Sequence, residues 1–238
     1  MSSMRKYQHS QKWYKPAWST TIPLQRLWNL SGIGVQARDE KKQKPLILKC
    51  YQERMSLRAL GRVFHVHYQS VSRWIKEHVD GLPTFESTLL PARPDDILEF
   101  DEAWSFVRQK INKRWLWTVM CRRTRQIIAF VIGNRSENTC RQLWHKIPSD
   151  YQGCLAFSDY WKAYQKVLPE ATHIAVGKET GETAHMERWY CTLRQRQARY
   201  VRMTLSFSKS EVVHHMVTEW FIIDHHLAIN NQPASLTL

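Results

Sequence analysis

The sequence predicts an α/β protein with a mixed sheet, three antiparallel strands followed by parallel strands with helices, preceded by an all-α region. Three observations predict this class. Apolar residues recur at helical spacing within residues 45–79, three apolar strand-like runs follow residue 96, and short strands then alternate with helical stretches as far as residue 227. Hydrophobic residues make up 43% of the 238, which is enough for a folded core.

Changes in composition divide the chain into four segments. Residues 1–44 are polar and basic with weak periodicity, and we expect poor order there. Residues 45–80 read as one helical stretch, Leu46 to Tyr51, followed by two short amphipathic helices, with Ser56 as the N-cap of the first of these two. Residues 81–96 contain three prolines and a glycine, which predicts a linker. Residues 97–238 hold the predicted sheet.

The sheet domain is predicted element by element. A polar turn, Arg122 to Arg125, separates the second and third apolar runs and favours an antiparallel meander. The order of three strands, helix, strand, helix, strand, helix is that of a ribonuclease-H-like mixed sheet. We predict strands at 97–107, 115–121, 126–132, 154–157 and 173–176, and helices at 137–147, 160–167, 183–200 and 210–227.

The charge of the chain indicates a polyanionic partner. The formal net charge is +14, and residues 1–94 hold 16 Lys and Arg against 6 Asp and Glu, whereas residues 95–238 hold 19 against 15. Nucleic acid is the usual polyanion, with an anionic membrane as the alternative. The five cysteines form no CxxC pair, and no apolar run is long enough to span a bilayer. We therefore expect a cytoplasmic, nucleoid-associated protein with no zinc finger and no membrane partner.

The helices of residues 45–80 fit a helix-turn-helix, in which the second helix enters the major groove of DNA. Gln69 and Arg73 are the candidates for base edges, and Ser70 and Lys76 for phosphates, with Tyr68 on the same outer face. The alternative is an ordinary helical hairpin with a solvated polar face.

Acidic residues occur within and next to apolar strands, where burying their negative charge is costly unless a partner compensates it. Asp101 and Glu102 lie inside a predicted strand, on opposite faces, and one of them must face a compensating group. Asp159 ends an apolar strand, and Glu187 lies on a predicted helix with Arg194 two turns further along the same face. Oxygen ligands from separate elements suit two Mg²⁺ or Mn²⁺ ions. Each carboxylate alone is more often a surface or capping group.

Several motifs are distributed from the helical region to the segment before the last predicted helix. They are Phe100 to Trp104, Ser158 to Tyr164, Gly177 to Thr183, His185 to Trp189 with Leu193 to Arg196, Thr204 to Ser210, and Met55 to Arg62 with Val71 to Lys76. Together these motifs resemble the insertion-sequence IS-one family of bacterial DDE transposases, and the resemblance covers about residues 45–232.

The resemblance implies a ribonuclease-H-like fold and metal-dependent strand cleavage and strand transfer at insertion-sequence ends. It implies Asp101, Asp159 and Glu187 as the catalytic residues holding two ions per active site, with Asp101 rather than Glu102 as the first ligand. We expect His185, Arg188 and Arg194 to contact DNA beside them. The implied partners are double-stranded DNA, both terminal inverted repeats and target, and further copies of the chain, as a homodimer or larger synaptic assembly.

Other interpretations stay open. The resemblance implies an N-terminal zinc ribbon, yet residues 1–44 contain no cysteine. This favours the alternative of a catalytically dead or truncated element acting as a DNA-binding regulator. A nuclease such as a junction resolvase is a third class on the same fold. We expect most tryptophans to be core, and the pairs His214–His215 and His225–His226 to lie on helix surfaces or to contact a partner.

Overall fold

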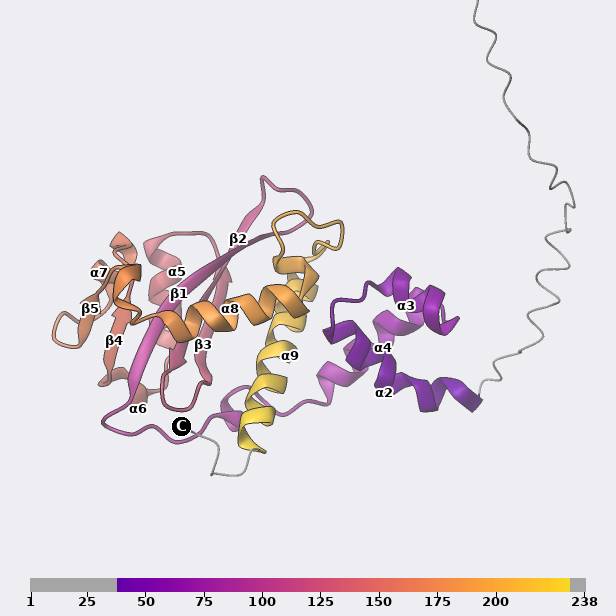
Figure 1. The fold of residues 1–238 in the computed structure, drawn as a ribbon, viewed down its shortest axis with the longest axis horizontal. Coiled ribbons are helices and arrows are strands. Elements are labelled where there is room, and N and C mark those ends of the chain that lie inside the picture. Colours follow the sequence, from indigo (N-terminus) through magenta and orange to yellow (C-terminus); the bar gives the residue numbers. More distant parts are fainter. Residues whose placement is uncertain (1–37, 232–238) are drawn as a thin grey trace, which may run out of the picture.

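A computed structural model of the chain describes residues 38–231 (Figure 1). Residues 1–37, most of the segment for which we expected poor order, lie outside the described residues, and residues 38–44 belong to the first described helix. The helices are α2 (Arg38–Gln52), α3 (Leu57–Phe64), α4 (Tyr68–Asp80), α5 (Glu137–Lys146), α6 (Ser149–Gln152), α7 (Lys162–Val167), α8 (Ala184–Arg196) and α9 (Glu211–Asn230), with 3₁₀ turns η1 (Glu86–Thr88), η2 (Lys178–Thr180) and η3 (Ala198–Tyr200). The strands are β1 (Ile97–Phe106), β2 (Lys113–Cys121), β3 (Ile127–Gly133), β4 (Leu155–Ser158) and β5 (His173–Ala175).

The five strands form one mixed sheet in the order β3-β2-β1-β4-β5. The pairs β1–β2 and β2–β3 are antiparallel, whereas β1–β4 and β4–β5 are parallel. The predicted mixed α/β class is therefore confirmed, and the arrangement is compatible with a ribonuclease-H-like fold.

Helices cover both faces of this sheet (Figure 1). On one face, Phe100 and Trp117 of the sheet pack with Leu143 of α5 and Tyr164 of α7. On the other, sheet residues pack with the apolar faces of α8 and α9. Because both faces are covered, β1 and β2 are largely buried along their length, as their apolar runs predict. The result is three layers, with β1 in the middle of the central one.

The N-terminal helices pack together and against α9. Ser56 caps α3, as predicted, by accepting a hydrogen bond from the Ala59 amide at 3.1 Å. A three-residue turn that includes His65, with φ of +55°, connects α3 to α4. Val217 and Trp220 of α9 enter the core of α2, α3 and α4. The helical region and the sheet domain therefore share α9.

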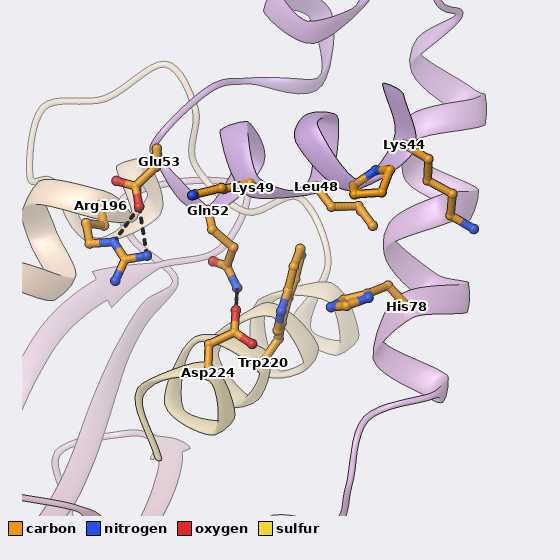
Figure 2. A pocket seen from close by; sticks show the side chains of 10 residues that line it. Lys44, Leu48, Lys49, Gln52, Glu53, His78, Arg196, Trp220 and Asp224 are labelled. Atoms are coloured by element: carbon orange, nitrogen blue, oxygen red, sulfur yellow. Dashed lines mark hydrogen bonds and ion pairs between the residues drawn. The ribbon is translucent and has the colours of Figure 1, made fainter. Parts of the chain in front are cut away.

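A cavity of about 540 Å³ lies where α2, α4, α8 and α9 meet (Figure 2). Figure 2 shows Trp220 and Asp224 of α9 facing Leu48 and Gln52 of α2 across it, with the Arg196–Glu53 ion pair at one side. Gln52 donates to Asp224 at 3.3 Å. The junction is thus partly polar and incompletely filled.

Two further findings concern expectations from the sequence. The expected linker, residues 81–96, packs against the sheet domain, because Phe85 is buried against Phe130 with ring centroids 5.5 Å apart. The expectation that both histidine pairs lie at the helix surface or contact a partner was wrong for His214 and His226, which are completely buried. Within residues 38–231, no helix combines the length and the apolar character needed to cross a membrane.

Candidate active site

The two neighbouring carboxylates of β1 point to opposite faces of the sheet, as strand alternation predicts. Glu102 faces the α5/α7 layer, where the Tyr164 hydroxyl donates to it at 2.8 Å and Arg135 Nε at 2.7 Å. The Arg135 guanidinium also lies 4.0 Å from the ring centroid of Trp161 and 4.8 Å from that of Trp115. The negative charge of Glu102 is therefore compensated by groups of this chain.

Asp101 faces the α8 side. Its carboxylate forms no ion pair with any side chain of residues 38–231. Its Oδ1 accepts a hydrogen bond from the Glu102 amide at 2.8 Å, and its backbone carbonyl accepts one from the Tyr190 hydroxyl, also at 2.8 Å. Burial raises the pKa of Asp101 to about 7, with the negative charges of Glu102 and Asp159 acting in the same direction and Lys178 opposing them. A cation beside Asp101 would relieve this cost.

Asp159 follows the carboxyl end of β4. Strand β4 runs parallel to β1, with Ile97 opposite Leu155 and Glu99 opposite Phe157. The same register, continued two residues further, places Asp159 beside Asp101. The half-buried Asp159 accepts the Trp161 amide at 2.9 Å, which holds its carboxylate at the strand end.

Glu187 lies on the first turn of α8 and is exposed. The buried face of this helix carries Met186, Trp189, Tyr190 and Leu193, which leaves positions 187 and 194 on the outer side. The start of α8 is held to β1 by Glu99, which accepts the Met186 amide at 3.1 Å and contacts His185 Nδ1 at 2.6 Å. Position 187 is thereby oriented relative to Asp101.

One cavity of about 150 Å³ brings the three predicted carboxylates together. Its lining residues are Phe100, Asp101, Glu102, Trp115, Arg135, Asp159, Val176, Lys178, Thr183 and Glu187. As the side chains stand, no three His, Cys, Asp or Glu residues within 38–231 surround a single point closely enough to hold one ion jointly. Asp101, Asp159 and Glu187 are thus neighbours around one space, coming from β1, the end of β4 and α8.

Sequence reasoning missed four other members of this region. Arg135 and Lys178 bring positive charge to the cavity wall, and the first has no local sequence signal because it sits in a polar turn. Lys178 lies within the Gly177–Thr183 motif, which was noted without a role. Buried Glu99 was also missed, as was Arg122, whose guanidinium joins Glu99 to Glu182 with a distance of 2.8 Å to each.

The predicted DNA contacts near the cavity are on α8. His185 is half-buried and occupied by its contact with Glu99. Arg188 and Arg194 are exposed, the second with its guanidinium 5.7 Å from the Tyr190 ring centroid.

The predicted contacts of the helix-turn-helix lie on α4 and do not reach this cavity. Tyr68, Gln69, Arg73 and Lys76 are exposed and Ser70 is half-buried, while Val71, Trp74 and Ile75 form the buried face. Figure 1 shows α4 beyond α9, well separated from β4 and β5. The structure therefore offers two separate polar surfaces.

Comparisons with known proteins bear on the whole sheet domain. The family model for the IS1 transposase matches residues 97–228. The chain is 37% identical over 131 residues to the insertion element iso-IS1n protein InsB of Shigella dysenteriae, covering 54% of this chain and 95% of that protein. It is 33% identical over 133 residues to the insertion element IS1 protein InsB of Shigella flexneri, covering 56% and 95%.

A further relative is the insertion element IS1 4 protein InsB of Escherichia coli (strain K12), with 32% identity over 133 residues, covering 56% of this chain and 74% of that protein. The family match begins at the first residue of β1 and spans all three acidic positions. It covers more than half of the chain, including every strand. The chain therefore belongs to the IS1 transposase family.

Proposed function

We propose that this transposase catalyses metal-dependent strand cleavage and strand transfer at the ends of an insertion sequence. The observation that carries the proposal is the convergence of Asp101, Asp159 and Glu187 on one cavity from three separate elements. Glu102 is adjacent but already paired with Arg135 and Tyr164, which leaves Asp101 as the uncompensated carboxylate of β1.

The chemistry of these residues fits hard divalent cations. All three side chains are carboxylates, the donors that Mg²⁺ and Mn²⁺ prefer, and burial penalises the charge of Asp101 unless a cation is near. Glu187 is exposed on the first turn of its helix, so its side chain can turn into the cavity without disturbing the core. When bound, two such ions would activate the attacking oxygen and stabilise the leaving 3′ oxygen.

The reaction proposed has two displacements at phosphorus. In the first, a water oxygen forms a bond to the phosphorus at the element end and the bond to the 3′ oxygen breaks. In the second, the freed 3′ hydroxyl forms a bond to a phosphorus of the target while the bond from that phosphorus to the target's own 3′ oxygen breaks, and that oxygen leaves as a hydroxyl. Lys178, Arg188 and Arg194 supply positive charge along the path of the phosphates, and the protein forms no covalent bond to DNA.

We further propose that α4 binds the terminal repeats. Its exposed Gln69 and Arg73 are long enough to reach base edges, while Tyr68, Ser70 and Lys76 contact the backbone. Because two element ends must be held together for transposition, the active form is a dimer or larger.

The test compares Asp101→Asn, Asp159→Asn and Glu187→Gln with the unmodified chain on labelled element ends. Each variant should lose cleavage and strand transfer by about 10³-fold or more while it still binds the DNA. The matched control is Glu170→Gln, an exposed glutamate outside the cavity, which should keep both activities.

Two measurements decide between this function and its alternatives. Strand transfer by a pre-cleaved element end in Mg²⁺ separates a transposase from a nuclease. If the unmodified chain binds element ends but neither cuts nor joins them at any Mg²⁺ or Mn²⁺ concentration, the chain is a DNA-binding regulator and the proposal is wrong.

A further inference from the structure

The tip of the β1–β2 hairpin and the loop before α9 form one continuous surface, here named the hairpin surface and made of residues 107–113 and 201–209. Val107 pairs with Ser208, and the Arg108 amide donates to the Ser208 carbonyl at 2.8 Å. Phe106 and Phe207 pack beneath, with ring centroids 5.3 Å apart. In Figure 1 both loops lie at the same end of the molecule.

This surface exposes large apolar side chains. Ile111 is 80% exposed at the hairpin tip, and Met203 and Leu205 are 87% and 96% exposed on the adjacent loop. Single exposed apolar residues are common in soluble proteins, but three of them on two joined loops indicate a binding surface. None of the three lines either of the two cavities described above.

The charge around these apolar residues is positive. The hairpin surface contains Arg108, Lys110, Lys113, Arg202 and Lys209 and no Asp or Glu. All five are exposed. The nearest acidic residue along the chain, Glu211, is paired with Arg114 at 2.6 Å. The positive charge is therefore free to meet a polyanion.

The position of the surface relative to the cavity matters for what it binds. Strand β1 continues five residues beyond Asp101 to Phe106, a length of about 17 Å at the usual rise of a strand. The hairpin thus extends past the cavity. It is also distinct from α4, which lies on the far side of α9 (Figure 1).

We propose that the hairpin surface binds the target duplex. This inference rests on the proposed function, because strand transfer requires a second DNA segment at the cavity and α4 is assigned to the first. Lys110, Lys113 and their basic neighbours contact phosphates. Ile111, Met203 and Leu205 insert between base steps from the minor groove and kink the duplex. Apolar wedges flanked by Lys and Arg bind and bend DNA in this way without reading much sequence.

The first test measures how much the lysines of the hairpin surface contribute to DNA binding. Lys110→Ala/Lys113→Ala should weaken binding of a duplex of arbitrary sequence and reduce the slope of log K against log salt by about 1.8, since each lost phosphate contact removes about 0.9. The matched control, Arg141→Ala/Lys166→Ala, removes the same charge from an exposed face of α5 and α7 and should leave the slope unchanged.

The second test measures whether the exposed apolar side chains unstack the bases of the target. A target duplex carrying 2-aminopurine reports unstacking as an increase in fluorescence. Ile111→Ala and Met203→Ala/Leu205→Ala should abolish this increase and lower strand transfer about tenfold while cleavage of the element end stays within about twofold of the unmodified chain. Val63→Ala, which truncates an exposed residue of α3, is the control. These residues are exposed, so folding is not at risk.

The outcomes separate the two proposals. If the unmodified chain shows no strand transfer, the proposed function fails. The DNA-binding and fluorescence measurements still test whether the hairpin surface binds a duplex. If Ile111→Ala leaves unstacking and strand transfer unchanged, the inference is overturned. If it instead converts an oligomer to a monomer, the surface joins copies of the chain and the inference is overturned as well.

Discussion

The two fully buried histidines of this protein, His214 and His226, each have hydrogen-bond partners at both ring nitrogens. His226 Nε2 accepts the Ile127 amide at 3.2 Å, so its Nδ1 carries the proton and donates to Thr88 Oγ1 at 2.7 Å. The Thr88 hydroxyl in turn donates to the Phe85 carbonyl at 2.6 Å. His214 likewise bridges the Ser105 and Ser208 hydroxyls. Both rings are thus neutral in the folded protein.

These two histidines should therefore contribute less stability in acid. Burial lowers the pKa of His214 and of His226 to about 3, against an ordinary value near 6.5 in the unfolded chain. Since the unfolded state binds more protons at these two rings between these values, the stability that each histidine contributes is complete above about pH 6.5. It falls as the pH drops toward 3, by up to about 1.4 kcal/mol per pH unit for each histidine.

Urea unfolding between pH 7.5 and 5 checks this expectation. The His226→Gln variant removes one titrating ring, so the difference in unfolding free energy between it and the unmodified chain should shift in favour of the variant as the pH falls. An unchanged pH dependence would contradict the assigned role of His226.

Arg135 should stabilise the fold because its carboxylate partner, Glu102, is buried. Removing it by Arg135→Ala leaves the nearly inaccessible Glu102 carboxylate with only the Tyr164 hydroxyl, and should cost about 1–3 kcal/mol of folding free energy. Arg141→Ala, which breaks an exposed i,i+4 pair with Glu137, should cost only about 0.3–0.5 kcal/mol. Chemical denaturation of both variants measures the difference, and equal costs would refute the buried-pair assignment.

At the scale of elements, the relation between β1 and α8 determines the geometry of the candidate site. Both carry a predicted catalytic carboxylate, and buried Glu99 joins them through the Met186 amide and His185 while also pairing with Arg122. The pairing of Tyr190 with the Asp101 carbonyl adds a second connection. Together these contacts hold the helix against the strand next to the cavity.

Glu99→Ala should loosen the first turn of α8. The change leaves the Met186 amide and Arg122 without their acceptor, which should cost about 1–3 kcal/mol and raise amide exchange at residues 184–188. DNA cleavage should fall as well, because Glu187 is no longer held in place. Glu182→Ala, which removes only the more exposed partner of Arg122, is the control. Normal exchange in the Glu99 variant would show that Glu99 does not position α8.

At the scale of the whole molecule, α9 joins the two halves. One part of this helix packs on the sheet through Phe221 and Ile222, and another enters the core of α2 to α4 through Val217 and Trp220. Tyr51 stacks parallel to Trp220, and His78 approaches it with ring centroids 4.9 Å apart. Stability of the DNA-binding candidate region and of the sheet domain is thereby coupled.

Trp220→Ala should break this coupling. Truncation of a buried tryptophan costs about 3–5 kcal/mol, and here the loss falls on the junction. We expect the N-terminal helices to unfold before the sheet domain, seen as two transitions in calorimetry where the unmodified chain gives one. Val213→Ala on the exposed side of α9 should leave a single transition. A single, merely lowered transition in the Trp220 variant would mean that the halves are coupled by other contacts.

Local sequence patterns were sufficient for the strands and for most of the helices. Strand alternation, helical spacing and the Ser56 cap depend on neighbours within a few residues, and the five strands occur near their expected positions. Asp101 and Asp159 could be named as candidates because a carboxylate in or at the end of an apolar strand conflicts with its surroundings. The catalytic role of these two and of Glu187 came from the family resemblance and stays a prediction.

Tertiary structure decided what those residues meet. The compensation of Glu102 by Arg135 and Tyr164, the burial of His214 and His226, and the packing of Trp220 against α2 and α4 all join residues far apart in the chain. Periodicity reports only which face of an element is apolar, and long-range partners are chosen by packing and by the cost of leaving a buried polar group unpaired. The strands, most of the helices and the candidate carboxylates of β1 and β4 therefore followed from the sequence alone, whereas their partners and the shared cavity were determined by the fold.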